Sequence, residues 1–164
     1  MSNTKELVIT RTFNAPRELV FKAFSEAERM AKWWAPPGMA IEVVRFEFKP
    51  GGMFLYCSKN EQFEMWGRFV YKDILSPERI VFINSFSDKD GSIAKSPFHP
   101  VWPLEVHNTL TLTEADGKTT MELRGGPINA TAEEQKVFEE NTGNMQQGFK
   151  GVLDQLEAYL ESAE

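Results

Sequence analysis

The chain has 164 residues, the length of one domain, and its 41% hydrophobic and 26% charged residues are typical of a globular protein. Its 24 acidic against 18 basic residues argue against a protein that binds nucleic acid or anionic membranes, because both functions depend on clustered lysine and arginine. The single cysteine excludes an internal disulfide framework, and without a run of about 18 apolar residues we expect no membrane insertion. One cytoplasmic domain over residues 1–164 is therefore expected.

The first forty residues predict a strand followed by two short helices. Alternating, β-branched residues indicate a strand over Lys5–Phe13. Pro16 stands where a helix favours proline, and apolar residues follow it at helical spacing. Ser25 is placed to cap a second helix, which ends at Pro36-Pro37-Gly38.

From residue 41 the sequence alternates as β-strands do, and turn-forming residues divide it into six further strands. The predicted strands are Ile41–Phe48, Met53–Ser58, Phe63–Ile74, Arg79–Phe86, Leu104–Thr113 and Lys118–Arg124. In the third of these segments, Glu64 and Arg68 share one parity, so the other parity faces inward. In the first, Glu42 and Arg45 point outward at opposite parities. A bulge near Val43-Val44 resolves this conflict and curves the sheet.

A long irregular stretch, Ser87–Pro103, interrupts the strands. Loops of this length are uncommon inside compact domains and often act as lids or binding loops. Two interpretations stay open: an ordered cover beside a cavity mouth, or a plain excursion into solvent.

The last third of the chain predicts a long helix over Thr131–Leu160, about 45 Å in length. Thr131 and Glu134 form the pattern of a capping box. Asn141 and Gly148 fall on the apolar stripe of this helix, where a packed helix favours larger apolar residues. Either the helix is kinked or broken around Asn141–Asn144, or these small and polar positions line a cavity.

Five segments, in this order, are similar to one known family: Asn14–Phe21, Trp33–Gly38, Lys49–Phe54, Gly67–Phe82 and Gly148–Leu160. The first resembles the opening signature of the START/birch-pollen-allergen-like superfamily (SRPBCC). The second resembles the double-tryptophan turn of the branch named after the heat-shock ATPase activators. Together the segments cover nearly the whole chain.

The resemblance implies an α+β helix-grip fold. In this fold a curved antiparallel sheet of six to seven strands wraps around a long C-terminal helix, and two short helices follow the first strand. A hydrophobic cavity lies between sheet and helix. Members of the superfamily bind lipids, sterols, polyketides or other apolar molecules, and some are aromatases or cyclases.

The residues themselves favour binding over catalysis. Neither a nucleophile elbow nor a phosphate-binding loop is present. His99 and His107 lack the spacing of a metal site, and Cys57 is expected to face away from the interior. Since no carboxylate or histidine falls clearly on the inner face, we expect no catalytic residue, no metal and no cofactor.

The candidate ligand-binding residues are the bulky and polar side chains assigned to the inner face. Asparagine and tyrosine orient ligands by hydrogen bonding, although each asparagine is equally well read as a buried amide satisfied by backbone or water. The candidates are Trp34, Met39, Phe46, Phe48, Phe54, Tyr56, Met65, Phe69, Tyr71, Phe82, Asn84, Phe86, Trp102, Asn108, Asn141, Met145 and Phe149.

Three functions are compatible with this sequence. The leading hypothesis is a carrier or sensor of a small apolar, ring-containing ligand held in an internal cavity. The alternative is an enzyme of the polyketide cyclase or aromatase kind, which requires a titratable group in the cavity with a shifted pKa. A chaperone ATPase co-regulator is suggested by the branch name alone. Trp66, on the outward parity, is a candidate for a homodimer contact.

Overall fold

The computed structural model describes residues 6–35, 38–96 and 99–162. Three sequence predictions extend beyond these residues. Lys5, the first residue of the predicted first strand, lies outside them, as do Pro36 and Pro37 of the predicted turn. Pro97 and Phe98, within the predicted irregular stretch, also lie outside them.

The order of elements follows the prediction. The described part begins with β1 (Leu7–Phe13), α1 (Arg17–Ser25) and α2 (Ala27–Trp33). Six strands follow: β2 (Ala40–Phe46), β3 (Met53–Lys59), β4 (Glu64–Leu75), β5 (Arg79–Phe86), β6 (Glu105–Ala115) and β7 (Lys118–Ile128). The last elements are α3 (Ala132–Glu140) and α4 (Thr142–Ser162). Within the described ranges, no helix is long and apolar enough to cross a bilayer.

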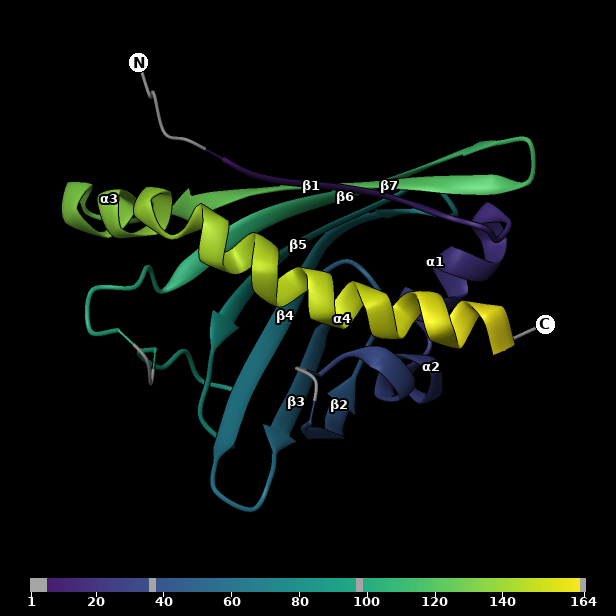
Figure 1. Ribbon diagram of the computed structural model, residues 1–164. Coiled ribbons are helices and arrows are strands. Elements are labelled where there is room, and N and C mark those ends of the chain that lie inside the picture. The colour runs from purple at the N-terminus through teal and green to yellow at the C-terminus, as the bar shows by residue number, and fades with distance from the viewer. Residues whose placement is uncertain (1–5, 36–37, 97–98, 163–164) are drawn as a thin grey trace.

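The seven strands of the described part form one antiparallel sheet in the order β1-β7-β6-β5-β4-β3-β2. The sheet curves, α4 crosses one of its faces, and α1 and α2 lie beside the C-terminal half of α4 (Figure 1). The α+β helix-grip fold predicted from the sequence is therefore confirmed.

Two irregularities in strand pairing account for part of the curvature. The register of β2 on β3 shifts between Val43 and Arg45, at the position where the sequence predicts a bulge. A second shift, between Tyr71 and Asp73, interrupts the pairing of β4 with β5. An extra residue in one strand of a pair bends that strand and increases its twist, so both shifts help the sheet to close around α4.

The predicted C-terminal helix is two helices that meet at Asn141. The capping box at its start is present, since Thr131 Oγ1 accepts from Glu134 N at 3.0 Å and the Glu134 carboxylate accepts from Thr131 N at 2.9 Å. Asn141 Nδ2 donates to Val137 O at 2.7 Å, and Asn141 Oδ1 accepts from Asn144 Nδ2 at 2.9 Å. Asparagine side chains that bond nearby backbone compete with the regular helix, which explains the break at this residue.

An aromatic cluster fills the end of the sheet beside α1. Phe48 packs edge-on against Phe21 of α1 and Tyr71 of β4, with ring centroids 5.8 and 4.9 Å apart. Phe46 packs similarly on Phe54, which is completely buried. Such pairs contribute about 0.5–1.5 kcal/mol beyond the area they bury. This end of the molecule is therefore solid core.

The loop between β5 and β6 covers the outer face of the sheet with its first half. Gly91 approaches Met53 and Leu55, and its carbonyl accepts from Arg68 Nη1 at 2.8 Å. Cys57 shares the outward parity of Leu55, as predicted, yet it is fully buried. Burial raises the pKa of this thiol, whereas a nucleophilic cysteine needs a lowered one.

Candidate functional site

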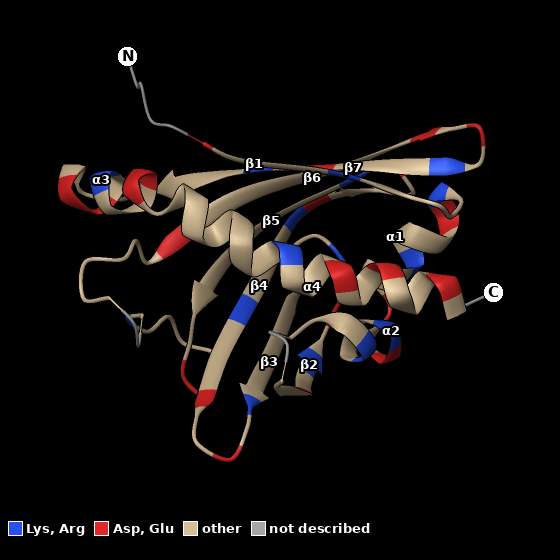
Figure 2. Ribbon diagram, in the orientation of Figure 1, with Lys and Arg blue, Asp and Glu red and all other residues tan. Residues whose placement is uncertain are grey.

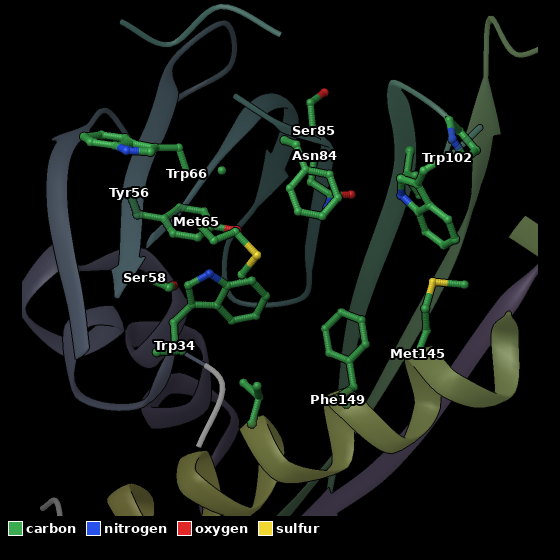
Figure 3. A pocket seen from close by; sticks show the side chains of 17 residues that line it. Trp34, Tyr56, Ser58, Met65, Trp66, Asn84, Ser85, Trp102, Met145 and Phe149 are labelled. Atoms are coloured by element: carbon green, nitrogen blue, oxygen red, sulfur yellow. The ribbon is translucent and has the colours of Figure 1, made fainter. Parts of the chain in front are cut away.

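A cavity lies between α4 and the inner face of the sheet, and it has three adjacent lobes that share walls. The β3 lobe, of about 400 Å³, lies between β3, β4, β5 and α4 (Figure 3). The α3 lobe, of about 420 Å³, lies toward α3, and a deep lobe of about 70 Å³ reaches toward α1 and α2. The two large lobes each fall in the range of about 300–1,000 Å³ that is usual for small-molecule sites.

The β3 lobe is lined mainly by apolar and aromatic side chains. Its lining residues are Trp34, Ala35, Tyr56, Ser58, Met65, Trp66, Gly67, Asn84, Ser85, Phe86, Trp102, Pro103, Val106, Met145, Gly148, Phe149 and Val152. Of the labelled side chains, Trp34, Met65 and Phe149 surround the central space, whereas Trp66 and Ser85 point away from it (Figure 3). The indole N–H of Trp66 donates to Glu64 on the outer face.

The two tryptophans at the end of α2 have different positions: Trp33 lies in the core and Trp34 lines the cavity. Trp33 is buried and its indole N–H donates to Ala23 O at 3.1 Å, whereas Trp34 packs edge-on against Phe69 of the sheet. Gln155 of α4 holds this turn in place, because its Nε2 donates to the carbonyls of Trp33 and Ala35 at 3.0 and 2.7 Å. The two hydrogen bonds hold the backbone on either side of Trp34, whose side chain lines the cavity.

Tyr56 places a hydroxyl in this wall. Its ring lies directly over Gly67, where an added Cβ would meet the phenol oxygen at 2.6 Å. The apolar surroundings raise the pKa of Tyr56 to about 12, an effect that a hydrogen bond from Trp34 partly offsets. Burial and the neighbouring Tyr56 also raise the pKa of Tyr71. Tyr56 is therefore a neutral hydrogen-bonding group at physiological pH.

Two asparagines form a ladder across β5 and β6. Asn108 Nδ2 donates to Asn84 Oδ1 at 2.7 Å and to Val106 O at 3.0 Å. The Asn108 amide oxygen lies against Gly125 of β7, where an added Cβ would collide with it. Asn84 lines all three lobes, and Asn108 lines the α3 lobe and the deep lobe.

The wall contributed by α4 contains one gap in its row of large side chains. Met145, Gly148, Phe149 and Val152 line the β3 lobe at helical spacing. Apart from the adjacent residues and the backbone of the helix itself, no atom lies within 4 Å of the position that a Cβ would take at Gly148, and the same is true of Gly143. These glycines therefore leave open space and do not mark a close approach of two backbones.

The structure brings twelve of the predicted residues together around the lobes: Trp34, Tyr56, Met65, Phe69, Phe82, Asn84, Phe86, Trp102, Asn108, Asn141, Met145 and Phe149. Five others line none of the three: Met39, Phe46, Phe48, Phe54 and Tyr71. The last four belong to the aromatic cluster beside α1 or pack against it. Alternation assigned the correct face of the sheet, but it carries no information on how far along each strand the space extends.

Several lining residues were not among the predicted ones. Ser58 follows Tyr56 by two residues, so its parity indicated the same face; its hydroxyl is buried and has no hydrogen-bond partner among the described residues. Val106 could have been found in the same way from Asn108. Leu7 of β1 lines the α3 lobe together with His99, for which the sequence offered no signal.

The electrostatics of the cavity are close to neutral. Among the described residues, no Asp, Glu, Lys or Arg lines any of the three lobes. The first turns of α4 carry no charge and the charged residues lie further along the helix (Figure 2). His99 Nδ1 accepts from Val101 N at 3.1 Å. No group of three or more metal-binding side chains occurs in the described ranges.

The chain is similar to known families and structures over nearly its whole length. The family model described as "Activator of Hsp90 ATPase homolog 1-like protein" matches residues 14–161. No curated protein matches the sequence.

Solved bacterial structures share the fold. Protein Ms6760 from Mycobacterium smegmatis is 24% identical, with a TM-score of 0.79 over 99% of this chain and 94% of that one. A protein from Staphylococcus epidermidis is 25% identical, with a TM-score of 0.77 over 100% of this chain and 94% of that one. At such identities the likeness describes the fold.

Proposed function

Because the chain belongs to the family of Activator of Hsp90 ATPase homolog 1-like proteins, whose fold commonly binds hydrophobic ligands, we propose that it binds a small, neutral, ring-containing molecule as a carrier or sensor. The observation that carries this proposal is the β3 lobe, a cavity of about 400 Å³ with aromatic walls. Its occupant would lie between α4 and the sheet.

The physical basis of the proposal is desolvation. Transfer of apolar surface from water contributes about 25 cal/mol per Å², so a bicyclic or tricyclic molecule gains several kcal/mol by entering the lobe. Trp34 and Phe149 project into it from two different elements, with ring centroids 6.2 Å apart. A flat aromatic guest would pack against their faces and edges.

Proton-transfer chemistry has less support in the β3 lobe, where Tyr56 is the titratable side chain among the described residues. A general acid or base works best when its pKa lies near the working pH. The pKa of Tyr56 is about 12, so this hydroxyl holds its proton at neutral pH. We therefore propose binding in preference to a cyclase reaction.

The proposal is tested by a substitution that places a large side chain in the β3 lobe at Gly148. In Gly148→Leu the new side chain would enter space that no atom occupies, and replacing a helical glycine stabilises the helix by up to about 1 kcal/mol. The matched control is Gly143→Leu, because Gly143 is also in α4 with open space around it but lines none of the three lobes.

Binding is measured with N-phenyl-1-naphthylamine, a neutral aromatic probe whose fluorescence rises in apolar surroundings. We expect the wild-type protein and Gly143→Leu to bind the probe alike and Gly148→Leu to bind it at least about tenfold more weakly, the effect of a clash of about 1.4 kcal/mol. Equal binding by all three proteins would place the site elsewhere. No binding by the wild-type protein would refute the proposal. Native mass spectrometry of the freshly purified protein adds a search for a retained ligand.

A further inference from the structure

Asn84 lies where the three lobes of the cavity meet. Among the described residues, Asn84 and Phe149 are the two that line all three lobes. They extend toward the central space from opposite walls, Asn84 from β5 and Phe149 from α4 (Figure 3). A molecule in any of the three lobes would therefore lie close to the Asn84 amide.

The orientation of that amide follows from its neighbours. Val106 O is a backbone carbonyl and only accepts, so the Asn108 atom facing it at 3.0 Å must be the amide nitrogen. The same nitrogen faces the Asn84 side chain at 2.7 Å, so the Asn84 atom facing it must be the oxygen. Asn84 Nδ2 is then the end of the amide that is not engaged with Asn108.

The N–H groups of Asn84 Nδ2 have no partner among the described residues. The Tyr56 hydroxyl, in the wall of the β3 lobe, is a second group that can donate a hydrogen bond. In the described part of the chain, no carboxylate lines the lobes to accept from either group, and no lysine or arginine lines them to neutralise an anionic ligand. The cavity thus offers neutral donors inside apolar walls.

We propose that the ligand carries an uncharged acceptor oxygen, of the ketone or quinone kind, that accepts a hydrogen bond from Asn84 Nδ2 while its rings lie in the β3 lobe. This inference rests on the proposed function and narrows its ligand class. A donor in an apolar site discriminates strongly against a molecule that leaves it unpaired. An anionic ligand would lose its hydration without gaining a cationic partner.

The test compares two probes of the same shape, 2-acetylnaphthalene and 2-isopropenylnaphthalene, in which a carbonyl oxygen replaces a methylene group. Dissociation constants are measured by quenching of tryptophan fluorescence. We expect the wild-type protein to bind the ketone roughly tenfold more tightly, the net effect of one hydrogen bond. Asn84→Leu should lose this preference. Asn14→Leu, at an exposed position that lines none of the three lobes, should keep it.

A second measurement uses the wild-type protein, so the test does not depend on how well Asn84→Leu folds. At saturating probe, the side-chain amide protons of Asn84 should shift further downfield with the ketone than with the alkene, because only the ketone accepts a hydrogen bond. Equal affinity for the two probes, or a preference that survives in Asn84→Leu, would overturn this inference and leave the proposed function standing. If neither probe binds, the proposed function fails and the inference fails with it.

Discussion

At the scale of single residues, the wall of the cavity depends on a glycine that makes room for a ring. Tyr56 lies over Gly67 so closely that an added Cβ would be 2.6 Å from its oxygen and 2.7 Å from Cζ. The two residues are also cross-strand partners in β3 and β4. The Tyr56 ring therefore occupies this part of the wall only because position 67 has no side chain.

The first prediction follows from this contact. Gly67→Ala should displace the Tyr56 ring and lower the free energy of unfolding by about 1–3 kcal/mol, as overpacking does elsewhere. Chemical denaturation measures the loss. Gly126→Ala in β7 is the control, because the nearest atom to its added Cβ is 4.0 Å away. Equal stabilities of the two variants would show that Tyr56 moves aside without cost.

The raised pKa of Tyr56 predicts a dependence of stability on alkaline pH. The unfolded chain releases this proton near pH 10 and the folded protein near pH 12, so ionisation favours the unfolded state between these values. Below pH 10 the stabilising contribution is complete. Between pH 10 and 12 the free energy of unfolding should fall by up to about 1.4 kcal/mol per pH unit more in the wild-type protein than in Tyr56→Phe. If the free energy of unfolding falls with pH equally in the two proteins, this prediction is wrong.

At the scale of secondary-structure elements, one side chain joins the end of α2 to α4. Gln155 donates to two carbonyls of the turn that carries Trp34, at Trp33 and Ala35. Trp33 is the last residue of α2 and Ala35 lies just beyond it, in the region where a helix leaves carbonyls without intrahelical partners. The same bonds fix the distance between the Trp34 wall of the cavity and α4, which forms another wall.

Replacing this side chain should loosen both helix and cavity. Gln155→Met keeps the length of the side chain but leaves two part-buried carbonyls without this donor, and we expect a loss of about 1–3 kcal/mol in the free energy of unfolding. Gln147→Met, at an exposed position of α4, is the matched control. The measurement is urea denaturation followed by circular dichroism. Unchanged stability in Gln155→Met would mean that α2 is held by apolar packing alone.

At the scale of the whole molecule, stability and binding are linked, because the cavity exists only when the sheet is closed around α4. A ligand that binds the folded state alone stabilises it by about 2.7 kcal/mol at a free concentration one hundred times its dissociation constant. For a chain of this length, N-phenyl-1-naphthylamine at that concentration should raise Tm by roughly 5–10 °C. At the same probe concentration the Tm of Gly148→Leu should rise by about half as much or less, because tenfold weaker binding leaves about 1.4 kcal/mol of stabilisation. A Tm that does not respond in the wild-type protein would show that the probe does not bind the folded state in preference to the unfolded chain.

The sequence by itself determined the features that depend on near neighbours. Alternation along β2 conflicted at Val43-Val44, and the bulge is there. Thr131 and Glu134 predicted a capping box, and both of its hydrogen bonds are present. Parity placed Asn84 and Asn108 on the face that α4 covers. Each of these features is set by residues within a few positions, so a single chain displays it directly.

Only the tertiary structure decided which inner-face residues line space and which fill it. Phe54 and Tyr56 have the same parity in one strand, yet Phe54 is buried in the aromatic cluster and Tyr56 lines the cavity. The difference arises because α1 packs against one end of the sheet. At the other end, Gly148 and the break between α3 and α4 at Asn141 leave room. Those contacts join residues of different elements, such as Phe21 of α1 and Phe48, and strand periodicity contains no information on them.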